Sequence, residues 1–165
     1  MDTGNTAFLI ICTALVLMMT PALAFFYGGL VRAKSVISMM MLSFGSMALI
    51  GSIWIIYGYA ITFSAPGNPG YVGIPGVIGI DLGHLGLEHL MEVPTNANVP
   101  PLVFAAFQAT FAIITVALIS GAIADRAKFG AWMVFAGVWA TVVYFPVASW
   151  VFNFQTDPDT GKLVS

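Results

Sequence analysis

Residues 7–31 read AFLIICTALVLMMTPALAFFYGGLV, a run of 25 residues without a charged side chain. A helix of about 20 apolar residues is long enough to cross the hydrocarbon core of a bilayer. The run begins almost at Met1, with no basic segment before it and no small-residue cleavage site after it. We therefore interpret it as a retained membrane span and not as a signal peptide.

Three further apolar runs follow, over about 36–63, 102–124 and 130–152, and clusters of charged residues or of Gly and Pro separate them. The chain is 59% apolar and only 7% charged, against roughly a quarter charged in soluble domains. We expect an all-α integral membrane protein with these four spans and an outer loop over 64–100. That loop holds seven glycines and five prolines, and we expect a short helix in it around His84 to Met91.

The basic residues give an orientation. Lys and Arg are concentrated on the cytoplasmic side of membrane proteins. With four spans, four of the five basic residues lie on one side of the membrane, and Lys162 alone lies on the other. The four are Arg32, Lys34, Arg126 and Lys128. The N-terminus is therefore expected outside. Six of the seven acidic residues then also lie outside, where they weakly concentrate cations: Asp2, Asp81, Glu88, Glu92, Asp157 and Asp159.

Several function classes are disfavoured by what the spans contain. No Asp, Glu, Lys, Arg or His lies in the interior of a span, so a proton relay within the membrane is not predicted. There is no GxSxG motif, neither histidine lies in a span, and an enzyme is disfavoured. The chain has a single cysteine, Cys12, and no basic patch for nucleic acid. No cofactor is expected.

A metal site in the outer loop is a minor alternative. His84 with Glu88, and Glu88 with Glu92, have the four-residue spacing that places ligands on one helix face, and Asp81 and His89 lie nearby. The order is not that of an HExxH zinc motif. We therefore predict no metal site.

Aromatic residues gather at the outer ends of the third and fourth spans. Phe107 and Phe111 are four residues apart and share one helix face; the others are Phe104, Tyr144, Phe145, Trp150, Phe152 and Phe154. An aromatic pocket attracts a small cation by about 0.5 to 2 kcal/mol. The alternative is that these rings face lipid or simply pack. The aromatic end of the second span, with Trp54, Tyr57 and Tyr59, is expected to form part of an interfacial belt.

Several motifs resemble a known family. Residues 11–17 (ICTALVL) followed by 24–32 (AFFYGGLVR) resemble the first helix of ammonium transporters of the Amt/Mep/Rh superfamily. The second and third helices of that family are resembled, in order and spacing, by 54–59 (WIIYGY), 106–108 (AFQ), 111–116 (FAIITV) and 121–126 (GAIADR). The resemblance covers nearly the whole chain except 65–100.

The resemblance implies an eleven-helix bundle with an inverted repeat, assembled as a homotrimer in a bacterial plasma membrane with one pore per subunit. The chain would be the N-terminal part of that fold, without the pore histidines of the later helices, and is not expected to transport as given. The family recruits ammonium, or its analogue methylammonium, at an outer aromatic site and conducts ammonia through a hydrophobic pore gated by two stacked phenylalanines.

Individual positions follow from the same resemblance. Phe107 and Phe111 match the two gate phenylalanines. The tryptophan of the recruitment site falls on Phe152, with Trp150, two residues earlier, as the less favoured position. Pore-lining positions fall on Leu23, Leu118 and Val151.

Two other functions remain open. One is an ammonium sensor that signals to a PII-type regulatory protein on the cytoplasmic face, with Arg32, Lys34 and Arg126 near the docking surface; we prefer to assign these residues to topology and lipid headgroups. The other is a channel for neutral solutes such as water or carbon dioxide. A neutral-solute channel explains the apolar spans but not the acidic, aromatic outer mouth.

Overall fold

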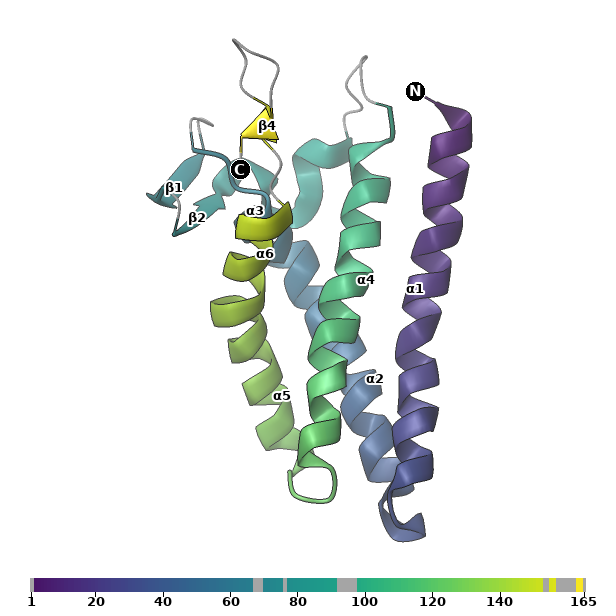
Figure 1. Ribbon diagram of the computed structural model, residues 1–165. Coiled ribbons are helices and arrows are strands. Elements are labelled where there is room, and N and C mark those ends of the chain that lie inside the picture. The colour runs from purple at the N-terminus through teal and green to yellow at the C-terminus, as the bar shows by residue number, and fades with distance from the viewer. Residues whose placement is uncertain are drawn as a thin grey trace.

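The computed structural model describes residues 2–66, 70–75, 77–91, 98–152, 155–156 and 163–164, and four long helical rods run side by side in it (Figure 1). Within the described residues four stretches are long and apolar enough to cross a membrane: Thr3–Leu30, Ala33–Thr62, Pro101–Ile123 and Phe129–Phe152. The expected all-α membrane fold with four spans is confirmed.

The first span is the single helix α1 (Thr3–Leu30), which continues through Pro21. The second joins η1 (Ala33–Ser35), α2 (Val36–Ile53), η2 (Trp54–Gly58) and α3 (Tyr59–Thr62). The third joins α4 (Pro101–Ile119) and η4 (Ser120–Ile123), and the fourth joins α5 (Phe129–Trp139), η5 (Ala140–Tyr144) and α6 (Phe145–Phe152). Both η2 and η5 are π-helical, with one more residue per turn than an α-helix has.

The connection between the second and third spans contains a small hairpin. Strand β1 (Tyr71–Ile74) pairs antiparallel with β2 (Ile78–Asp81), with Tyr71 opposite Asp81. Next comes η3 (Leu82–Met91), which is two 3₁₀ turns joined across a kink and not the one short helix we expected. The kink arises because Gly86 and Leu87 take the left-handed conformation, with φ of 66° and 60°. A second short hairpin pairs β3 (Gln155–Thr156) with β4 (Leu163–Val164).

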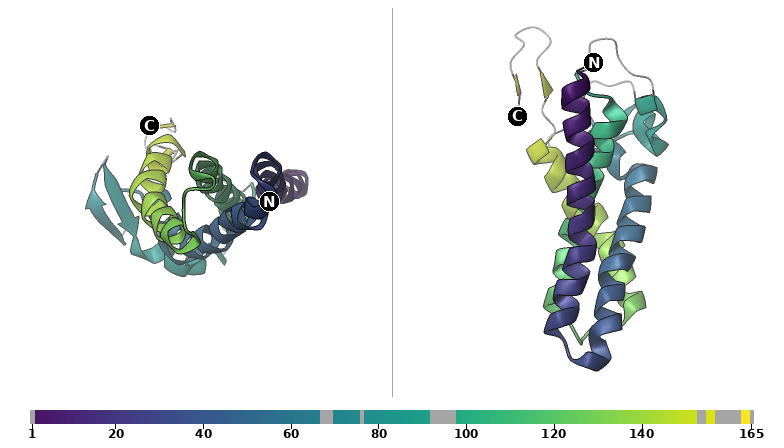
Figure 2. Two further views of the ribbon diagram at one scale, coloured as in Figure 1. Left: turned by 90° about the horizontal axis from the view of Figure 1, so that it is seen from below. Right: turned by 90° about the vertical axis from the view of Figure 1, so that its right-hand side faces the viewer.

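The helices pack around α2, which contacts α1, α4 and α5, while α1 also contacts α4. Figure 2 shows α1 and α5 on opposite sides of the bundle. The N-terminus lies beside the connection between the second and third spans, because the Asp2 amide donates to the Asn98 carbonyl at 3.0 Å. At the other end, Ser35 and Asp125 line one small pocket of about 140 Å³. The turns after the first and third spans therefore adjoin each other.

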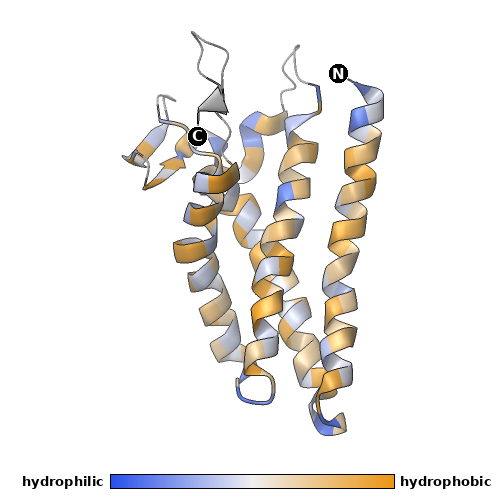
Figure 3. Ribbon diagram, in the orientation of Figure 1, coloured by the Kyte–Doolittle hydropathy of each residue, from blue (hydrophilic) through white to orange (hydrophobic). Residues whose placement is uncertain are grey.

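Charged residues in the described part of the chain lie outside the apolar body of the bundle. Arg32, Lys34, Arg126 and Lys128 are all exposed, in the two adjoining turns at the end opposite the N-terminus. Figure 3 shows mostly apolar colour between the two ends. Lys162 lies outside the described residues. The assignment of the N-terminus to the outside stays a prediction.

Indole groups join the helices. The Trp132 Nε1 donates to the Leu42 carbonyl at 3.1 Å and to the Ser46 Oγ at 2.9 Å, so it ties α5 to α2. The expected interfacial belt is wrong for Trp54 and Tyr59, which are only 2% and 6% exposed. Their rings pack against each other and against Phe63 instead, because they face the neighbouring helices and not the lipid.

The close approach of η2 and α6 requires a glycine at position 58. A Cβ built there would lie 2.7 Å from the Cζ of Phe145, whose ring is completely buried. The ring therefore occupies the space that a side chain would take. Gly29 is different, because a Cβ built there has no neighbour within 4 Å.

We expect Gly58→Ala to lower the free energy of unfolding by about 1 to 3 kcal/mol, the usual effect of overpacking a filled core. Gly29→Ala is the control, and it is expected to leave stability unchanged or raise it by about 0.5 kcal/mol, as replacing a helical glycine does. Thermal unfolding of the two purified variants in detergent, followed by circular dichroism, tests this. Equal midpoints in the two variants would contradict the close packing.

Candidate functional site

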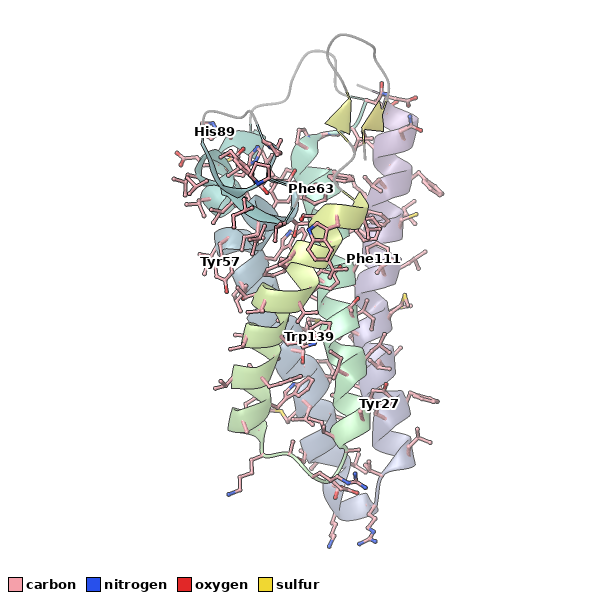
Figure 4. All side chains as sticks on the ribbon, turned by 60° about the vertical axis from the view of Figure 1, so that its left-hand side comes forward. Tyr27, Tyr57, Phe63, His89, Phe111 and Trp139 are labelled. Atoms are coloured by element: carbon pink, nitrogen blue, oxygen red, sulfur yellow. The ribbon has the colours of Figure 1, made fainter. Side chains whose placement is uncertain are left out.

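An aromatic cluster lies toward the end of the bundle that holds the N-terminus (Figure 4). Phe63, just after α3, contacts Phe104 of α4 at a ring distance of 5.3 Å and Tyr59 at 4.9 Å. Tyr59 also meets the ring of His84 from η3, edge to face at 5.7 Å. Such tilted and edge-to-face pairs are favourable arrangements of aromatic quadrupoles. The cluster forms a packed wall from three separate elements.

The two phenylalanines assigned to a gate are in contact. The ring centroids of Phe107 and Phe111 lie 4.9 Å apart at an interplanar angle of 81°. The pair is therefore edge to face, and not stacked as the resemblance implied. Phe107 is partly buried, whereas Phe111 is 37% exposed, so its ring is accessible from the open side of α4. We call Phe107 and Phe111 the ring pair.

An apolar stripe continues from the ring pair along α4. Phe107, Phe111, Ile114 and Leu118 are spaced by four, three and four residues, which places them on one helix face. Ile114 and Leu118 line an open groove of about 320 Å³ between α4 and α1, where Leu23 lies opposite them. The structure thus brings together Leu23 and Leu118, two of the three predicted pore-lining residues. All six residues of the groove are apolar.

The other predicted residues lie on the last turn of α6. Trp150, Val151 and Phe152 are 57%, 54% and 40% exposed. The Trp150 Nε1 donates to the carbonyl of Val77 in the first hairpin at 2.8 Å. Its indole N–H is therefore occupied in holding this hairpin. Within the described part of the chain Phe152 has no aromatic partner, and Phe154 lies outside the described residues.

Two of the acidic residues expected at the outer mouth have structural partners. Asp2 caps α1 by accepting from the amides of Gly4 and Asn5, the usual role of an N-cap aspartate. Asp81 is only 3% exposed, accepts from the Gly83 amide at 2.9 Å and lies 3.3 Å from the Nδ1 of His84. Asp81 therefore faces the protein and not the mouth, while Glu88 is exposed. Glu92, Asp157 and Asp159 lie outside the described residues.

The metal alternative finds no support in the described residues, where no three His, Cys, Asp or Glu side chains gather closely enough to hold an ion. The kink at Leu85 to Leu87 interrupts the helix on which the spacing of His84 and Glu88 depended. Glu92 is outside the described residues.

Sequence reasoning missed two hydrogen bonds that join the second span to the third and fourth spans. The Trp54 Nε1 donates to the Ala105 carbonyl of α4 at 3.1 Å, and the Tyr57 hydroxyl lies 2.8 Å from the Thr141 Oγ1. Trp54 and Tyr57 belong to η2, and Thr141 belongs to η5. No periodicity in the sequence signals a π-helical turn.

The sequence matches the model of the Ammonium Transporter Family over residues 7–159. It is 52% identical over 163 residues to an ammonium transporter of Mycobacterium bovis and 43% identical over 158 residues to one of Bacillus subtilis, and each match covers 93% of this chain. The matches cover 34% and 36% of those two proteins. The chain therefore spans about a third of the length of these relatives.

The comparison with solved structures agrees with the sequence comparisons on the fold. The crystal structure of Saccharomyces cerevisiae Mep2 superposes with a TM-score of 0.77 at 32% sequence identity, and that of Candida albicans Mep2 with 0.76 at 28%. Each match covers 93% of this chain and 32% of the other.

Replacing Trp150 by Phe should free the first hairpin, because the indole N–H to Val77 is lost while a ring remains. The loss of one hydrogen bond costs about 0.5 to 1.5 kcal/mol, so amides of β1 and β2 should exchange with deuterium several-fold faster. Trp139→Phe is the matched control, since the Trp139 indole has no hydrogen-bond partner among the described residues. Unchanged exchange in Trp150→Phe would show that the bond does not hold the hairpin.

Proposed function

Because this chain belongs to the ammonium transporter family, we propose that the whole protein moves ammonium across the plasma membrane. The observation that carries this proposal is the family match over residues 7–159, together with relatives that are themselves named ammonium transporters. In this proposal the outer aromatic residues recruit ammonium, and ammonia passes along an apolar path. The N-terminus lies outside and three copies form the working assembly.

The apolar groove supports the passage of ammonia and not of the cation. Leu23, Ile114 and Leu118 offer no oxygen to replace the water shell of an ion, and a bare charge in such surroundings is very costly. Ammonia therefore enters the apolar path alone and takes a proton from water on the inner side, after ammonium has released its own proton to water at the outer end. Whether that proton also crosses decides if the transport carries current.

Recruitment is assigned to the outer end of the helices. The exposed ring of Phe152 offers a face to a small cation, which is worth about 0.5 to 2 kcal/mol depending on how much water is removed. Phe107 and Phe111 stand at the outer end of the apolar stripe and therefore act as the gate. The exposure of Phe111 leaves its ring room to turn. Val151, next to Phe152, belongs to the pore wall in this proposal.

The exposed basic residues in the two inner turns favour a second candidate, an ammonium sensor that binds a PII-type regulatory protein. Arg32, Lys34 and Arg126 could contact an acidic protein surface, but lipid headgroups on the inner leaflet suit the same charges, and we prefer that assignment. Capture of a PII protein without any ammonium flux would favour the sensor. A neutral-solute channel is separated from both by competition binding, because it should show no ammonium site.

Two substitutions separate the gate from the recruitment site. We expect Phe111→Ala to change the maximal rate of methylammonium uptake several-fold and to leave the half-saturation concentration within about twofold. Phe152→Ala should instead raise the half-saturation concentration by about two- to thirtyfold, the factor that one cation–π contact of about 0.5 to 2 kcal/mol provides. Uptake is measured with the full reading frame in cells that lack their own ammonium transport.

The control is Phe25→Ala, which removes an equally large ring from α1 that is 65% exposed. It should leave both constants unchanged. Wild-type values for both Phe111→Ala and Phe152→Ala would remove these two residues from the mechanism.

The transport proposal itself is tested by the full reading frame in liposomes. An ammonium pulse is expected to produce a current that an equal sodium pulse does not. If no current appears, the internal pH of the liposomes shows whether neutral ammonia is conducted. Absence of both signals with correctly assembled protein would exclude transport and leave the sensor.

A further inference from the structure

Two spans contain a π-helical segment at the outer part of the bundle. In η2 the Tyr59 amide donates to the Trp54 carbonyl, and in η5 the Phe145 amide donates to the Ala140 carbonyl. These are i to i+5 bonds, which are rare and occur often at functional sites. Each adds one residue to a turn, so side chains beyond it are rotated by about 100° relative to a regular α-helix.

The two segments bind each other. The Tyr57 hydroxyl lies 2.8 Å from the Thr141 Oγ1, and the Thr141 hydroxyl donates to the Gly137 carbonyl of its own helix at 2.8 Å. A hydroxyl has one proton, so Thr141 accepts and Tyr57 donates. The ring of Phe145 then packs 6.2 Å from Tyr57 and 5.8 Å from Trp54. The segments η2 and η5 thus form one unit.

This unit holds α4 through η2. The Trp54 Nε1 of η2 donates to the Ala105 carbonyl of α4 at 3.1 Å. Ala105 lies two residues before Phe107, the first residue of the ring pair. Figure 4 shows Tyr57 and Phe111 at a similar height along the bundle. The part of α4 next to the ring pair is therefore held by the first π-helical segment, which the Tyr57 to Thr141 bond joins to the second.

We propose that the paired segments η2 and η5 set the position of the ring pair, and that Trp54, Tyr57 and Thr141 are positioning residues for the gate. The proposal rests on the proposed function, because it assumes that the ring pair gates ammonium transport. None of these three residues touches the substrate. The Tyr57 to Thr141 bond is the link between the segments, so breaking it frees η5 from η2 and loosens the hold on α4.

The first test compares Tyr57→Phe, Thr141→Val and the double variant in the full reading frame, by methylammonium uptake per folded molecule. Each single variant is expected to lower the maximal rate by about fivefold, the factor that one hydrogen bond provides, with half-saturation within about twofold. The double variant should be no slower than either single variant, because all three lose the same bond.

Ser52→Ala is the matched control. The Ser52 hydroxyl lies on α2 and donates only to the Ala48 carbonyl of its own helix at 2.9 Å, so its removal should leave the rate unchanged. A merely structural bond between Tyr57 and Thr141 would lower the amount of folded protein but not the rate per folded molecule. Wild-type rates in the single variants, or a double variant that multiplies the two single effects, would overturn the proposal.

A second measurement does not depend on transport. Amides of residues 101–115 should exchange with deuterium several-fold faster in Tyr57→Phe than in Ser52→Ala, because α4 has lost part of its support. Equal exchange in the two variants would overturn the positioning role. A wild-type protein without ammonium flux that still shows this difference would instead disprove the proposed function and leave the positioning role standing.

Discussion

The structure depends on one constraint, which is that a chain in a bilayer must satisfy its own polar groups because no water is there to do so. The spans meet it first by carrying no Asp, Glu, Lys, Arg or His in their interior. Several of their hydroxyls bond to the carbonyl one turn back, as Ser46 does to Leu42 and Thr62 to Gly58. Other donors are used between helices, where the indoles of Trp54 and Trp132 find carbonyls of neighbouring spans.

The same constraint explains how much of the fold could be predicted. Apolar length and the absence of charge are sufficient to recognise four membrane helices, because they follow from the solvent alone. They do not say which face of a helix meets protein and which meets lipid. Trp54 and Tyr59 were for that reason assigned to an interfacial belt although both are buried. The π-helical turns escaped prediction as well, since one added residue hardly alters the hydrophobic pattern of a helix that is apolar all round.

The candidate site, like the fold, could be predicted from the sequence only in part. Four-residue spacing predicted that Phe107 and Phe111 share a face, and their rings are in contact. Spacing could not give their edge-to-face angle. Nor could it bring Leu23 of α1 to Leu118 of α4, because only the packing of two helices does so; that pairing came from the resemblance. The bond from Trp150 to Val77 could not be predicted either, since it depends on a hairpin that is distant in the sequence.

An apolar groove cannot by itself provide the selectivity of the proposed transport, so another part of the protein must provide it. A wall made of Leu23, Ile114 and Leu118 excludes every ion by the cost of dehydration, but it cannot distinguish one small neutral molecule from another of similar size. In the proposed transport, discrimination must therefore occur before the groove, where aromatic faces meet the solvent. There it depends on the position of rings, and a ring on a helix is only as well placed as the helix that carries it. In the proposed function, the hydrogen bond from Trp54 of η2 to Ala105 of α4 belongs to the selective machinery in that sense, although it does not reach the path of the substrate.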